Sequence, residues 1–279
     1  MKIANALSKL ITIALLSGMI LMSSCSKDDP VAPSQQAAPE IPPLSTLEMD
    51  FSSFDTTGTS KLGKITGNGD QIRSDNNWRL AALKLGAWNL VLTINLVVPV
   101  AAFKASFTQT PEIQDDGSWT WSYNFGIGQS AELTARPSGG NIIWEMRISK
   151  PNTYTDFLWF TGESNITATE GSWQLFLNPQ NPQPYLNIVW HRDPENGTAD
   201  IRYTNVLAGD PGNGGSIFAA VTNDAPHDAI YQIRNTAINN EVDIEWSRTD
   251  FSGRIRDILV FSDTDWHCWD SNFQDVDCN

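Results

Sequence analysis

The feature that most constrains the fold is an alternation of apolar and polar residues that begins in the segment WTWSYNF. There Trp119, Trp121, Tyr123 and Phe125 would share one face of a strand, and the residues between them the other. The same alternation recurs at residues 131–135, 142–148, 173–177, 186–190, 201–203, 217–221, 229–233, 242–246 and 255–261. With residues 154–161 added, the pattern predicts about eleven strands.

Short clusters rich in Gly, Pro, Asn and Asp separate these segments, and such clusters favour tight turns between antiparallel neighbours. They are PSGGN, DPENG, AGDPGNGG, NDAPHD and DFSG. The sequence therefore predicts a mainly β fold, an antiparallel meander. A sheet of this size would curl into a barrel, half-barrel or sandwich to protect its edges.

The segment before the strands has a helical character. Residues 77–107 are dominated by Ala, Leu and Val, and the Asn residues at its start can cap a helix. Apolar side chains lie nearly all round it, which predicts a helix packed against or inside the sheet, with Pro99 kinking it or starting a second short helix. A membrane-spanning helix over residues 80–103 is the competing interpretation. Lys84, Asn89, Asn95 and Pro99 interrupt that span.

The first 24 residues have the pattern of a signal peptide: a basic start, an apolar run and small residues before Cys25. The stretch LMSSC resembles the lipobox of bacterial lipoproteins, with Met22 where the family usually has Leu. The following SKDD resembles the signal that sends Bacteroidota-type lipoproteins to the cell surface. The resemblance implies an acylated Cys25 that anchors the chain in the lipid bilayer of the outer membrane, facing the cell surface or alternatively the periplasm.

After Cys25, residues 25–45 are rich in Pro, Ala, Gln and Ser, which predicts an extended tether. Residues 46–279 are then a single β-rich domain. The chain carries 18 basic and 32 acidic side chains, a net charge of −14, which argues against binding nucleic acid through a basic patch. The expected outward positions of the strands are polar, which argues against a membrane-spanning barrel.

Cys268 and Cys278 lie close together near the C-terminus, and an exported protein meets an oxidising compartment, so we expect a disulfide between them. Acidic residues surround the pair, which raises calcium binding as a hypothesis; a solvated acidic tail is the default, because the loop lacks the Gly and Glu of a calcium-binding loop. These residues are Asp263, Asp265, Asp270, Asp275 and Asp277.

The sequence gives little support for an enzyme, a metal or a cofactor. His191, His227 and His267 lie far apart, which disfavours zinc, and no catalytic motif is present. Paired carboxylates of the kind used in glycoside hydrolysis stay open as a possibility on the strands. Asp257 stands out because it falls on the apolar face of its strand, where an ion needs a partner such as Arg.

The strand aromatics are either core residues or the lining of a pocket. As pocket residues the candidates are Trp119, Trp121, Tyr123, Trp144 and Trp246, while Trp266 and Trp269 are candidate stacking platforms for sugar rings. We therefore expect a non-catalytic binding domain for an apolar or amphipathic ligand. The alternatives are a glycan-binding surface lipoprotein of a polysaccharide-uptake system and a structural envelope component.

A second, unspecific resemblance supports the first of these. The segment FKASFTQT (residues 103–110), residues 128–137 with their closing Arg-Pro, and the pair Trp144-Glu145 are similar to the opening of the lipoprotein-localisation carrier family. That family implies a helix before a half-open barrel that holds acyl chains. The helical segment is longer and more apolar in this chain.

Overall fold

The computed structural model describes residues 37–49 and 76–278. The expected signal peptide, Cys25 and most of the tether lie outside the described residues. Within them the domain is mainly β, as predicted: one open, half-barrel-like sheet of 14 antiparallel strands in which every strand pairs with its neighbours in sequence. No hydrogen bonds join β1 to β14 within the described part of the chain, so the sheet does not close into a barrel.

The eleven predicted strands are confirmed, and three short ones were missed. The long strands are β2 (Trp119–Phe125), β3 (Gln129–Ser138), β4 (Asn141–Lys150), β5 (Tyr154–Asn165), β6 (Glu170–Asn178), β7 (Asn181–Asp193), β8 (Thr198–Asn205), β9 (Ser216–Val221), β10 (Ala229–Asn235), β11 (Asn240–Trp246) and β12 (Gly253–Asp257). The short ones are β1 (Glu112–Ile113), β13 (His267–Trp269) and β14 (Asp275–Val276). A four-residue helix, α2 (Ile258–Phe261), occupies the end of the last predicted strand.

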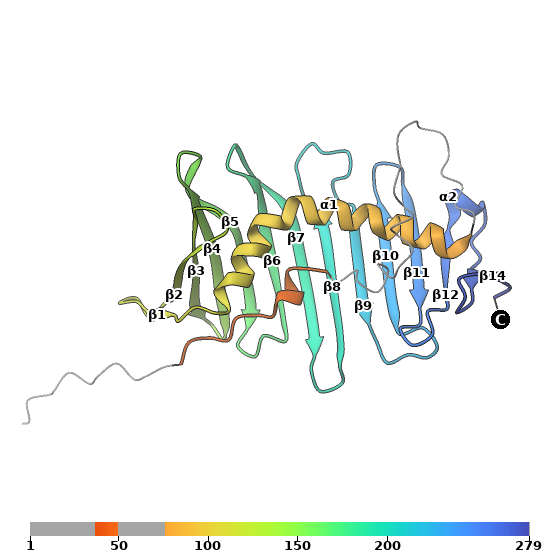
Figure 1. The fold of residues 1–279 in the computed structure, drawn as a ribbon, viewed down its shortest axis with the longest axis horizontal. Coiled ribbons are helices and arrows are strands. Elements are labelled where there is room, and N and C mark those ends of the chain that lie inside the picture. The colour runs from red at the N-terminus through yellow and green to blue at the C-terminus, as the bar shows by residue number, and fades with distance from the viewer. Residues whose placement is uncertain (1–36, 50–75, 279) are drawn as a thin grey trace, which may run out of the picture. The chain divides into compact units, whose positions relative to one another are not determined.

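Helix α1 (Asn77–Ser106) lies across one face of this sheet (Figure 1). Its N-terminal part packs on β12 and β13 and its C-terminal part on β2, β3 and β4. Asn76 is the N-cap, because its side-chain oxygen accepts a hydrogen bond from the backbone N–H of Arg79 at 2.8 Å. The helix is continuous through Pro99, so of the two alternatives expected there, a kink or a second short helix, the second helix is not present. By length and composition α1 could cross a membrane, but here it forms part of the domain core.

The core lies between α1 and the inner face of the sheet, the face that carries the alternating apolar residues. Burial alternates along β2, β4 and β11 as the sequence predicts. A second covering element is the chain from residue 38 to residue 49, which includes the short 3-10 helix η1 (Leu44–Thr46) and runs beside α1 (Figure 1). The compact unit begins at Ala38, so the end of the expected tether is part of the domain.

Candidate functional site: a groove beside helix α1

Residues 44–49, the η1 segment, are fixed to the inner face by two aromatic side chains. The indole N–H of Trp173 donates to Thr46 Oγ1 at 3.2 Å, and the hydroxyl of Tyr203 donates to the carbonyl oxygen of Leu47 at 3.0 Å. Burial raises the pKa of Tyr203 far above its ordinary value, so it stays a neutral donor. These bonds satisfy polar groups that would otherwise be buried without partners. Met49 is thereby held at the sheet, 7 % exposed.

One hollow lies between the η1 segment and strands β7 to β10. It has a volume of about 140 Å³ and apolar walls formed mainly by Trp190, Ile201, Ala219 and Tyr231. The Trp190 side chain is 1 % exposed, and its indole Nε1 has no hydrogen-bond partner in the described part of the chain. A buried donor of this kind is uncommon in folded proteins. His191, Arg192 and Asp200 complete the lining.

A larger groove, of about 300 Å³, runs along α1 on the other side of Met49. Its α1 residues recur at the spacing of one helical face. They are Asn89, Leu92, Thr93, Leu96, Val97, Val100, Ala101 and Lys104, with Glu48 and Met49 opposite. This face is apolar from Leu96 to Ala101, while Asn89 and Thr93 make one end polar and the Lys104 ammonium group lies at the other. At 1.5 Å per residue, the face from Asn89 to Lys104 is roughly 22 Å long.

The two hollows share Glu48 and Met49, and together they form the candidate site, called here the α1 groove. Mostly apolar walls with a few polar groups are typical of small-molecule binding sites. No ion pair joins Lys104 to a carboxylate in the described part of the chain, so its charge is free to meet a ligand. The site can therefore hold an amphipathic molecule by apolar contact along the helix and by polar contact at the ends.

None of the seven aromatic residues predicted to bind a ligand lines the α1 groove. Five of them are buried: Trp121, Tyr123, Trp144, Trp246 and Trp269. Trp119 is half-buried. Tyr123 joins the helix to the sheet, because its hydroxyl donates to the carbonyl oxygen of Ala102 at 2.7 Å. These positions are those of core residues, and ligand binding by them stays a prediction.

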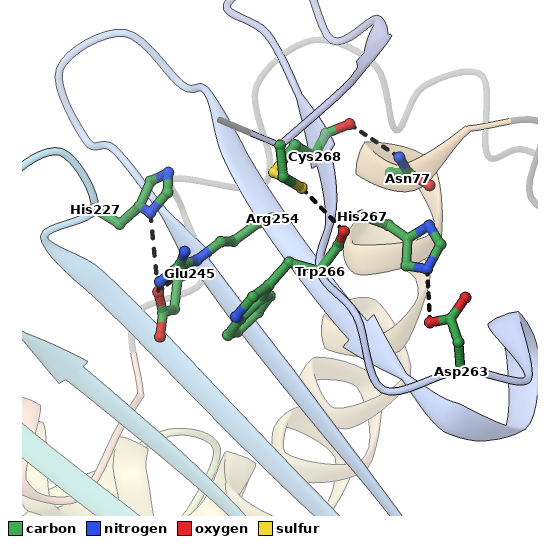
Figure 2. Close-up of a disulfide and its surroundings, with 9 residues drawn as sticks. Asn77, His227, Glu245, Arg254, Asp263, Trp266, His267 and Cys268 are labelled. Atoms are coloured by element: carbon green, nitrogen blue, oxygen red, sulfur yellow. Dashed lines mark hydrogen bonds and ion pairs between the residues drawn. A yellow bond between two sulfur atoms is a disulfide. The ribbon is translucent and has the colours of Figure 1, made fainter.

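The exposed stacking surface expected for Trp269 is not present, because its side chain is 1 % exposed. Trp266 is half-buried on the other face of the sheet (Figure 2). The guanidinium groups of Arg254 and Arg256 lie 4.3 Å and 4.8 Å from the centre of its ring. Glu245 pairs in turn with Arg254 at 2.5 Å. The ring is thus engaged by protein cations, and a glycan-binding role for it stays a prediction.

The C-terminal disulfide is confirmed: Cys268 and Cys278 are joined, with their Cα atoms 5.3 Å apart. The acidic residues around it serve local structure. Asp270 Oδ1 accepts the backbone N–H groups of Asn272 and Gln274 at 2.8 Å and 3.0 Å, which lowers its pKa. Asp263 accepts from His267 at 3.1 Å (Figure 2). Among the described residues, no three His, Cys, Asp or Glu side chains converge as metal ligands.

Asp257 has the cationic partner that its position demands, but that partner is a lysine from α1. Lys84 Nζ lies 2.6 Å from Asp257 Oδ2, and the amide of Asn240 donates to Oδ1 at 2.9 Å. Asp257 is 0 % exposed. The group is a structural ion pair that fixes the helix on β12.

The residues of the α1 groove were missed for two reasons. Residues 44 and 45 were assigned to the tether, although Leu44, Leu47 and Met49 add apolar side chains that the Pro-rich stretch before them lacks. Trp190 belonged to a recognised strand, but nothing in the alternation separates a groove-lining Trp from a core Trp. Comparison of the chain with protein families, with curated proteins and with solved structures gives no match.

Proposed function

We propose that this chain is a lipid-anchored envelope protein whose domain binds an amphipathic ligand, without catalysis, in the α1 groove. The observation that carries the proposal is the groove face of α1, which is apolar from Leu96 to Ala101 and polar at Asn89, Thr93 and Lys104. Half of a bilayer's hydrocarbon core is about 15 Å thick, so one extended acyl chain is shorter than the groove face. In this proposal the membrane anchor is the acylated Cys25 that the lipobox-like sequence implies.

The test is a titration of the chain from Ser26 onward, which keeps every described residue, with a fluorescent fatty acid. Ala101→Trp adds a large side chain to the groove wall from an exposed position, so we expect about tenfold weaker binding. Ala87→Trp is the matched control, because Ala87 is exposed on the same helix and does not line the groove. Its affinity should equal that of the parental chain.

Two results would contradict the proposal. One is that the parental chain does not bind the fatty acid, and the other is that both Trp variants bind it as the parental chain does. The melting temperatures of the two variants should agree, which separates loss of the groove from loss of the fold.

A further inference from the structure

Helix α1 leaves a second apolar surface uncovered, on the side turned away from the sheet. Leu90, Val91, Ile94 and Val97 are between 45 % and 64 % exposed. Their spacing places them together on one side of the helix, called here the outer face of α1. No charged residue occurs in the 19 positions between Lys84 and Lys104. A contiguous row of large exposed aliphatic side chains marks a contact surface.

The polar side chains beside this row are bonded back to the helix itself. The Asn95 amide donates to the carbonyl oxygen of Val91 at 2.7 Å, and the Thr93 hydroxyl donates to the Asn89 side-chain oxygen at 3.2 Å. Water would satisfy these exposed groups without such bonds. In an apolar medium internal bonding is required, because an unsatisfied polar group costs several kcal/mol there.

We propose that the outer face of α1 rests on a lipid bilayer, with its apolar row at the boundary between headgroups and acyl chains. The charge pattern favours this occupant. From Asn77 to Ser106 the only charged residues are Arg79, Lys84 and Lys104, all basic, in a chain whose net charge is −14. Lys84 is paired with Asp257 and does not contribute, so the helix is favoured at an anionic lipid surface by Lys104 and by the lack of any acidic residue from Asn77 to Ser106.

The same charges disfavour a second copy of the chain as the occupant. If two α1 helices packed face to face, neither helix would offer a carboxylate to the basic residues of the other, because no acidic residue occurs from Asn77 to Ser106. A bilayer contact at this face would also place the α1 groove next to a source of amphipathic molecules, since Val97 belongs to both surfaces.

The experiment uses the full chain reconstituted into vesicles of phosphatidylethanolamine with a minor share of phosphatidylglycerol. Ile94→Cys supplies a thiol for an environment-sensitive fluorophore, and Ile238→Cys is the control, because Ile238 is 59 % exposed in the turn between β10 and β11. Vesicle-bound chain is isolated by flotation and compared with and without brominated acyl chains in the lipid. The parental chain, treated with the same reagent, gives the background from Cys25.

We expect the fluorophore at position 94 to lose roughly half of its emission to the brominated lipid, while the one at position 238 is unaffected. Adding Leu90→Glu to the Ile94→Cys chain should abolish the quenching. A carboxylate is unfavourable in the apolar part of the bilayer and is repelled by the anionic headgroups. Equal quenching at both positions, or none at position 94, overturns the proposal. Disulfide cross-linking of unlabelled Ile94→Cys chains in the vesicles also overturns it, since the face would then be occupied by a second copy.

Discussion

Asp257 shows how far one residue can be interpreted from sequence. Its place on the apolar side of a strand predicted a buried carboxylate with a cationic partner, and both expectations are confirmed. The identity of the partner could not be predicted, because Lys84 reaches it from a helix that the strand pattern does not place. The Asn240 amide and the backbone N–H of Leu259 also donate hydrogen bonds to this carboxylate.

This ion pair gives a sharp stability prediction. Lys84→Met keeps most of the alkyl chain but removes the charge, which leaves Asp257 buried beside an apolar group. We expect the free energy of unfolding to fall by about 3 kcal/mol, measured by denaturant titration. Arg234→Met is the control, because Arg234 and Glu241 form an exposed pair at 3.9 Å, and its effect should be under about 1 kcal/mol. Equal effects would show that the pair does not fix the helix.

His227 gives a pH prediction. Burial, and then the nearby Arg254, lower the pKa of His227 in the folded state below its ordinary value of 6.5. The unfolded chain therefore binds a proton first as the pH falls, and stability decreases from about pH 6.5 down to the folded pKa. His227→Gln should reduce the loss of melting temperature between about pH 7.5 and about pH 5. An unchanged pH profile in the variant would exclude this residue as a cause.

At the scale of elements, strand register creates contacts that no single strand predicts. Gly162 on β5 lies between Trp144 on β4 and Trp173 on β6, and the Trp173 ring occupies the space of the missing side chain. The same arrangement recurs where Gly253 lies between Trp246 and Trp269. The alternation predicted that these Trp side chains face inward. It could not show that a neighbouring glycine makes room for them.

The glycine prediction has a matched pair of variants. Gly162→Ala forces the Trp173 ring out of position, so we expect a loss of about 1–3 kcal/mol of stability, as in overpacked cores. Gly86→Ala meets no neighbouring atom within 4 Å and lies inside α1, so it should stabilise the protein by about 0.5–1 kcal/mol. Calorimetric melting of the two variants checks both signs. A neutral Gly162→Ala would mean that the ring can move aside freely.

Strands β1, β13 and β14 were missed for a physical reason. Each has only two or three residues, which is too few for the alternation to recur, so periodicity cannot show them. Leu259 and Phe261 continued the alternation of β12, yet they lie in α2, where the Asp257 side chain caps the helix. The same Asp257 side chain also contacts Lys84 of α1 and Asn240 of β11. These tertiary contacts favour the helical turn over the strand that the alternation predicted.

At the scale of the whole molecule, the sequence predicted the strand order and the covering helix but not where the domain begins. Composition assigned residues 38–45 to the tether. In the structure Ala38, Ile41 and Leu44 are partly buried and pack against the core. The open sheet ends at both edges in two-residue strands, which limits edge-to-edge pairing.

The boundary can be tested by shortening the chain. A chain that begins at Ser45 should melt at a lower temperature than one that begins at Ser26, because it lacks Ile41, Pro42 and Leu44. If the loss of each of these three residues removes about 1 kcal/mol of burial free energy, the melting temperature should fall by several degrees. A third chain that begins at Ala37 is the control and should melt like the longer one. Equal melting of all three would return residues 38–45 to the tether.

The C-terminal disulfide links the last edge of the sheet to the first turn of α1. The Asn77 amide donates to the Cys268 carbonyl oxygen at 2.9 Å, and the Asn77 backbone N–H donates to Asp275 at 2.8 Å. Both acceptors lie within the ten-residue separation that Cys268 and Cys278 close. The disulfide therefore holds the partners of the helix start in place, although the two segments are far apart in the sequence.

Replacing both cysteines by serine should thus weaken two distant segments together. We expect a loss of about 2–3 kcal/mol in the loop-entropy description of a short closed loop. Hydrogen exchange should become faster in β13, β14 and the first turn of α1. Strands β3 to β7 should keep their protection, because they pair only with one another and with β2 and β8. If exchange rose only in β13 and β14, the helix would not depend on the disulfide-bonded edge, and Asn76 alone would suffice to start it.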